Sequence, residues 1–75
     1  MSEYAVILVH TTSHAIRAHR VLKKAGRSAR LVPTPRHLSS DCGSAVRIAA
    51  DESEECEAIL SDAGVEIDRI ECLNR

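Results

Sequence analysis

The chain has almost no aromatic residues: one of its 75 residues is tyrosine, and tryptophan and phenylalanine are absent. Its core must therefore be built from Val, Ile, Leu and Ala side chains. The shortage also argues against RNA recognition on a sheet surface, because such domains stack bases on sheet aromatics and Tyr4 is the only candidate. We expect no nucleic acid partner.

Long apolar runs are lacking as well. The run YAVILV at residues 4–9 is far too short to span a bilayer, and the first residues lack the basic start of a signal peptide. With 44% hydrophobic and 28% charged residues, the composition is that of a globular domain. We expect one domain over residues 1–75, located in the cytoplasm, with no membrane partner.

Cysteines are few and odd in number. The three, Cys42, Cys56 and Cys72, cannot all pair within the chain, and no CxxC motif offers a redox couple or half a zinc site. We expect free, reduced thiols and no cofactor.

Charge is balanced overall but segregated along the chain. The net charge is −1, yet residues 10–47 hold eight Lys or Arg against one acid, and residues 48–75 hold nine acids against two Arg. This segregation can pair one helix with the other, pair two chains, steer an anionic ligand, or simply mark two solvated helix faces.

Hydrophobic patterning predicts four strands, at residues 4–10, 28–32, 45–49 and 65–72. Because the apolar phase of the last strand slips between Ile67 and Ile70, we expect a bulge or bend near Asp68.

Two amphipathic helices are predicted between these strands. The first runs from His14 and ends at Gly26, and the second begins at Asp51 or Ser53 and ends at Gly64. Their apolar faces are Ala15, Ala18, Leu22 and Ala25 in the first helix, and Cys56, Ile59, Leu60 and Ala63 in the second.

The predicted order is β-α-β-β-α-β. An internal echo supports it, since VLKKAGRSARLV (21–32) and ILSDAGVEIDRI (59–70) place a leucine and an Ala-Gly helix stop at the same offsets. Two split β-α-β halves with right-handed crossovers give an α+β ferredoxin-like plait, with both helices on one face of a four-stranded antiparallel sheet.

This topology predicts a site for the thiol of Cys42. The first and second strands run the same way, so the loop after the second strand should lie near the N-terminus of the first helix. One residue of the run Thr11, Thr12, Ser13 is expected to cap this N-terminus, and His14 follows the run. The helix dipole and Arg36 lower the pKa of a nearby thiol, whereas Asp41 raises it.

Simpler interpretations stay open. Ser39, Ser40 and Asp41 can be ordinary turn residues, Gly43 a turn glycine with positive φ, and Cys42 an incidental small side chain. A metal site would draw on His10, His14 and Cys42, but no recognised ligand spacing is present, and we expect no metal. Cys56 belongs to an apolar helix face, and Cys72 is expected in the core or at a frayed terminus.

Three segments, TTSHAIRAHRVLKKAG, LVPTPRHLSSDCG and SAVRIAA, resemble the selenium/sulfur carrier-like family of small bacterial proteins, over about residues 5–70. The motif that carries the resemblance consists of Pro33, Pro35, Arg36, Ser39, Ser40, Cys42 and Gly43. The resemblance implies that Cys42 is a carrier thiol.

We therefore expect a carrier of sulfur or selenium rather than a turnover enzyme, with one protein as donor and another as acceptor. Ser39, Ser40 and the amide of Gly43 would hold the terminal anion. The alternative is a small interaction or anion-binding module that uses the loop Ser39–Gly43 without covalent chemistry.

We also expect a homodimer. The run YAVILV is apolar on both faces, whereas the helices of a plait cover only one face of the sheet. A second copy would cover the other side through the open sheet face or an edge.

Overall fold

The computed structural model of the chain describes residues 3–35 and 43–74. The elements follow the predicted order, with a short 3₁₀ turn (η1) added before the second helix. They are β1 (Glu3–Leu8), α1 (Thr12–Lys24), β2 (Arg30–Pro33), β3 (Ser44–Ala49), η1 (Ala50–Glu52), α2 (Ser53–Asp62) and β4 (Arg69–Asn74).

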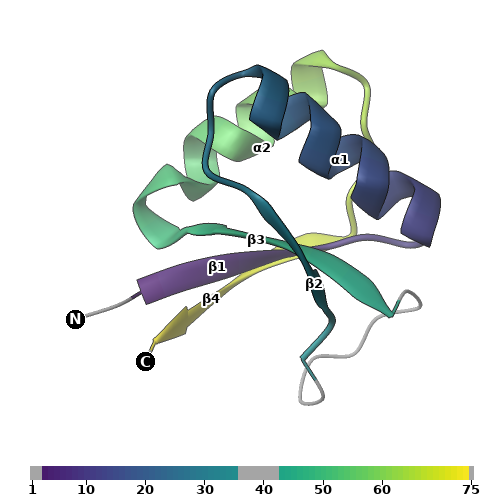
Figure 1. The fold of residues 1–75 in the computed structure, drawn as a ribbon. Coiled ribbons are helices and arrows are strands. Elements are labelled where there is room, and N and C mark those ends of the chain that lie inside the picture. Colours follow the sequence, from purple (N-terminus) through teal and green to yellow (C-terminus); the bar gives the residue numbers. More distant parts are fainter. Residues whose placement is uncertain (1–2, 36–42, 75) are drawn as a thin grey trace.

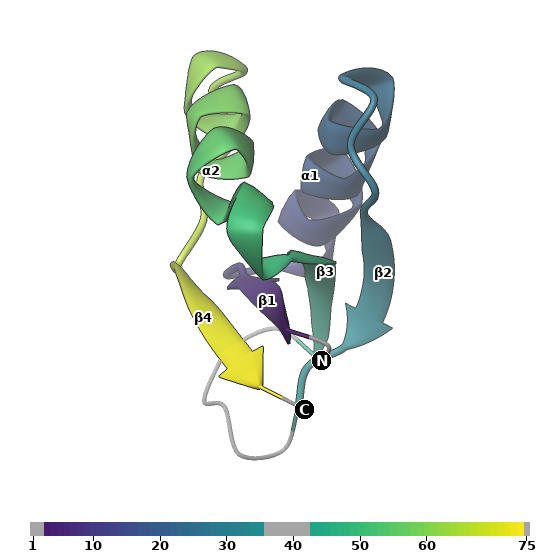
Figure 2. The same cartoon turned by 90° about the vertical axis from the view of Figure 1, so that its left-hand side faces the viewer.

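The four strands form one antiparallel sheet in the order β2-β3-β1-β4. Both helices pack on the same face of this sheet, as Figures 1 and 2 show from two directions. Two central strands, β1 and β3, therefore lie between two edge strands, β2 and β4. This is the predicted α+β fold, with the strand order and helix placement of a ferredoxin-like plait.

The main core lies between the helices and the sheet. Alternate residues of β1 and the residue that follows it, Ala5, Ile7 and Val9, point to this side because successive strand residues face opposite ways. Leu22 of α1 and Leu60 of α2 pack against them and are both buried, as predicted from helical spacing.

A second, smaller apolar cluster occupies the helix-free face of the sheet. Val6, Leu8 and Ala45 are fully buried there, with Tyr4 and Val32 packed against them. The apolar character of both faces of β1 is thus satisfied within a single chain. Burial of this cluster does not require a second copy.

Each helix ends in the same glycine motif, which confirms the internal echo. Gly26 and Gly64 have φ values of 83° and 73°, the left-handed conformation that glycine adopts without strain. After α1, the amides of Gly26 and Arg27 donate to the carbonyls of Lys23 and Leu22; after α2, those of Gly64 and Val65 donate to Ser61 and Leu60. These are Schellman motifs. Ala25 and Ala63, predicted on the buried faces, are instead exposed cap residues.

The last strand differs from its predicted span of residues 65–72. Val65 donates its amide to Leu60 and buries its side chain at the end of α2, so it belongs to the helix cap. The chain then bends at Asp68, whose amide donates to the carbonyl of Leu8 at 2.7 Å, and β4 begins at Arg69. The expected bend near Asp68 is confirmed, and it marks the start of the strand rather than an interruption.

Candidate functional site

Sheet topology places the start of α1 and the β2–β3 connection at the same end of the molecule. Both β1 and β2 are antiparallel to β3, so they are parallel to each other. Leu8 pairs with Ala45, and Pro33 pairs with Ser44. We call this end, where Leu8, Pro33 and Ser44 lie, the loop end of the sheet. The prediction that these two connections lie at the same end of the sheet is confirmed for their described residues.

A backbone hydrogen bond closes the β2–β3 connection. The amide of Thr34 donates to the carbonyl of Gly43 at 2.9 Å, one step beyond the last ladder pair. Gly43 is exposed and its φ is not positive, so its interpretation as a left-handed turn glycine is wrong. The remaining candidate residues of this loop lie outside the described residues: Arg36, Ser39, Ser40, Asp41 and Cys42.

The N-terminus of α1 is capped by the first of the three predicted residues. Thr11 has extended backbone angles, and its Oγ1 accepts a hydrogen bond from the amide of His14 at 3.2 Å. The same Oγ1 lies 3.1 Å from Nδ1 of His14. The side chains of Thr11, Thr12 and Ser13 are exposed, and that of His14 is half-buried. Solvent and ligands can therefore reach this turn.

The electrostatics of this turn favour an anion. The first turn of α1 contains no acidic residue, so no carboxylate of the helix itself offsets the positive end of its dipole. The last turn, by contrast, holds Lys23 and Lys24, which complement the negative end. An anionic group near Thr11 would be stabilised by the helix.

The two described thiols differ in environment. Cys56 is fully buried in α2, as predicted, and burial is the main cause that raises the pKa of its thiol. Glu52 and Glu55 raise this pKa further, while Arg27 lowers it. Cys72 is exposed on the edge strand β4, so the expectation of a core or frayed position is wrong. An edge strand has a neighbour on one side only, which leaves this side chain uncovered.

The histidines do not converge on a metal site in the described part of the chain. Within residues 3–35 and 43–74, no group of three or more His, Cys, Asp or Glu side chains is placed to hold a metal ion. His10 lies in the turn after β1 and is exposed.

None of the helices within residues 3–35 and 43–74 is long and apolar enough to cross a membrane.

Arg30 and Arg47 are two like charges that lie side by side, and the sequence patterns above did not indicate this pairing. They are direct cross-strand partners in the β2–β3 hairpin. Arg30 lies three residues before Pro33, and Arg47 lies three residues after Ser44; Pro33 and Ser44 are the pair that ends the ladder at the loop. The pairing of Pro33 with Ser44 would therefore have been enough to predict that Arg30 pairs with Arg47.

Comparison with known proteins gives one finding. The family model described as "Putative Se/S carrier protein-like" matches residues 3–71. A search of the curated proteins and a search of the solved structures each found no significant match. The matched segment contains Cys42 and Cys56 and ends before Cys72.

Proposed function

Because this chain belongs to the Se/S carrier protein-like family, we propose that it carries a sulfane sulfur or a selenium atom on the thiol of Cys42. The observation that carries the proposal is the family match over residues 3–71, taken together with the burial of the other cysteine inside that segment. The cytoplasm, where thiols are kept reduced, is the compartment that suits this role.

Elimination among the three thiols supports Cys42. A carrier thiol must be deprotonated and must be reached by two different partner proteins. Cys56 is fully buried with a raised pKa, which opposes both requirements. Cys72 is exposed but lies outside the segment that the family shares. Cys42 is the remaining cysteine.

The placement of the loop anchors supports a reactive thiolate. Gly43, the neighbour of Cys42 in sequence, lies at the loop end of the sheet, where α1 also begins. The positive end of the α1 dipole, without acidic residues in its first turn, stabilises negative charge there. Ser39, Ser40 and the amide of Gly43 are the groups we propose as hydrogen-bond donors to the terminal sulfur or selenium anion.

The proposed transfer follows thiol–persulfide exchange. The Cys42 thiolate attacks the outer sulfur of a donor persulfide, R–S–SH. A new S–S bond forms on Cys42, the donor S–S bond breaks, and the donor leaves as the thiolate R–S⁻. An acceptor thiolate then attacks the outer sulfur of Cys42–S–SH, which regenerates the Cys42 thiolate. With selenium, the loaded form is Cys42–S–SeH.

Mass spectrometry of the intact protein tests this proposal directly. Incubation with a cysteine desulfurase and cysteine should add the mass of one sulfur atom, and a reductant should remove it. Peptide mapping should place the added atom on Cys42.

Two serine variants separate a carrier thiol from an accessible one. Cys42→Ser should abolish loading, whereas Cys72→Ser, which removes an exposed thiol, should load like the wild type. Loading of Cys42→Ser, or no loading of the wild type with several donors, would refute a carrier role for Cys42.

A further inference from the structure

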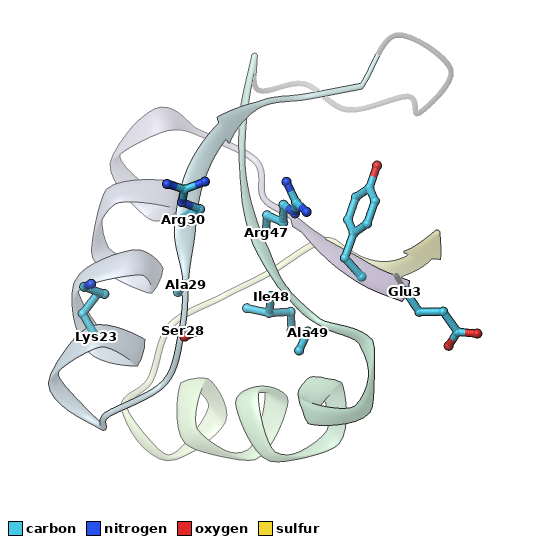
Figure 3. A pocket seen from close by; sticks show the side chains of 9 residues that line it. Glu3, Lys23, Ser28, Ala29, Arg30, Arg47, Ile48 and Ala49 are labelled. Carbon is cyan, nitrogen blue, oxygen red and sulfur yellow. The ribbon is translucent and has the colours of Figure 1, made fainter. Parts of the chain in front are cut away.

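A second site candidate lies at the other end of the sheet from the Cys42 loop. The hairpin ladder between β2 and β3 ends at the pair Arg30–Arg47, and Ser28 and Ala29, which precede β2, do not pair with the end of β3. A cavity of about 480 Å³ opens where the two strands separate. It is lined by Glu3, Tyr4, Lys23, Ser28, Ala29, Arg30, Arg47, Ile48 and Ala49, and Figure 3 shows it.

Two arginines face each other in this cavity. Arg30 and Arg47 are directly opposite in an antiparallel pair, so their side chains share one face of the sheet, and Figure 3 shows both guanidinium groups on the same side. Like charges opposite one another destabilise a sheet. Neither arginine has an ion-pair partner among residues 3–35 and 43–74, although acids outnumber bases in the chain.

The surroundings of the pair add positive charge and hold one arginine in place. Arg47 lies over the ring of Tyr4, with its guanidinium carbon 4.4 Å from the ring centroid, a cation–π contact that orients the guanidinium. Lys23, at the end of α1, lines the same cavity. Glu3 is the one carboxylate among the described lining residues, and Figure 3 shows it directed away from both arginines.

We propose that this cavity binds the phosphate group of a small phosphate monoester. Guanidinium groups bind phosphate oxygens through paired, charge-assisted hydrogen bonds, and two of them match the charge of a phosphate dianion. A monoanionic carboxylate would leave one of them unneutralised. The cavity volume falls in the range of small-molecule sites. Tyr4 and Ala49 pair directly across β1 and β3, lie on the same face of the sheet as the arginines and are half-buried, so they supply an apolar wall for the organic part of the ester.

This site is separate from the carrier loop in both place and chemistry. It lies at the end of the sheet opposite Leu8, Pro33 and Ser44, and none of its described lining residues carries a thiol. Its test therefore does not depend on sulfur loading, and a Cys42→Ser chain should bind phosphate monoesters like the wild type.

NMR titration of the amide-labelled protein with inorganic phosphate and with phenyl phosphate tests the proposal. Both ligands should shift the amides of Arg30, Arg47 and Ala49. Phenyl phosphate should bind more tightly, because its ring covers the apolar wall. In Arg30→Gln the dissociation constant should rise about tenfold or more, as expected for the loss of charged hydrogen bonds.

The stability of the free protein supplies an independent readout. Arg30 faces a like charge and has no ion-pair partner among residues 3–35 and 43–74. Arg30→Gln should therefore keep or raise the melting temperature of the free protein, and phosphate should no longer increase it. Arg20→Gln, an exposed change on α1, should retain that increase.

Three results would overturn the assignment. The first is phosphate affinity in Arg30→Gln within twofold of the wild type. The second is an equal melting shift from sodium chloride at matched ionic strength, which would indicate general screening. The third is phenyl phosphate binding no more tightly than inorganic phosphate, which would exclude an ester site.

Discussion

The environments of Cys56 and Cys72 decide how each thiol can react. Cys56 packs in the main core with a raised pKa, so its thiol is both covered and protonated near neutral pH. Cys72 is uncovered on β4. A free thiol count on the native protein therefore has to include Cys72, and accessibility alone does not identify the carrier cysteine.

We predict three different alkylation rates with iodoacetamide in the native state. Cys42 should react first, with an apparent pKa below about 8, if the α1 dipole and Arg36 favour its thiolate as we propose. Cys72 should react more slowly, and Cys56 only when the chain unfolds. Peptide mapping at a series of pH values measures this order. Labelling of Cys42 at the rate of Cys56 would contradict the prediction, and urea provides the control in which all three thiols react.

Leu60 tests the packing of α2 on the sheet. It is 1% exposed, so Leu60→Ala should lower the free energy of unfolding by about 2–5 kcal/mol. In a domain of this size such a loss can unfold the protein, which circular dichroism would detect. Ile16→Ala is the control, because Ile16 is 42% exposed on α1 and its truncation should change stability by less than about 0.5 kcal/mol. A cost below about 1 kcal/mol for Leu60→Ala in urea melts would mean that the helix face is misassigned.

The two helices are tied together at both ends by arginines from the first half of the chain. Arg17 of α1 donates to the carbonyl of Ala63 at 3.3 Å, at the C-terminus of α2, where the last turn of α2 has no basic residue of its own. Arg27, just after α1, lies 3.1 Å from Glu55 and 4.0 Å from Glu52 at the start of α2. Part of the charge segregation is therefore used to pair the antiparallel helices.

At the other terminus of α1, the cap provides an element-scale prediction. Thr11→Ala removes the acceptor for the amide of His14 and should cost about 0.5–2 kcal/mol in urea melts. Ser13→Ala is the matched control: Ser13 is exposed in the same turn, and its change should cost clearly less. If both variants lost the same stability, the Thr11 cap would not be the feature that starts this helix.

For the molecule as a whole, burial in a single chain limits how a homodimer can form. Val6 and Leu8 are already covered, so the helix-free face offers less apolar surface than its sequence indicates. The unpaired edges of β2 and β4 remain, and β2 carries Leu31, which is 45% exposed. Edge pairing through β2 is the form of the predicted homodimer that agrees best with this surface.

Sedimentation at a protein concentration of about 100 µM tests the homodimer. At this concentration a dimer with a dissociation constant of about 1 µM is nearly fully formed. The wild type should sediment as a dimer, and Leu31→Lys should shift it to a monomer by placing charge on the edge. Ile16→Lys changes an equally exposed apolar residue on α1 and should leave the dimer intact. A monomeric wild type would rule out the homodimer.

Local features of the sequence by themselves determined the element order, the Ala-Gly helix ends, the capping run that begins at Thr11 and the burial of Leu22 and Leu60. Each depends on spacing within one or two turns, or on the freedom of glycine at positive φ, so neighbouring residues suffice to predict it. The motif around Cys42 likewise indicated the family that the comparison found.

Only the tertiary structure decided which side chains meet across the sheet and which lie at its edges. The Arg30–Arg47 pair depends on the hairpin register. Cys72 is exposed because β4 is an edge strand. The strand β4 starts late because Val65 belongs to the cap at the end of α2. These contacts join residues distant in sequence, and a one-residue change of register would replace every partner. The composition of a strand does not encode that register, so it emerges only when the helices and the sheet pack together.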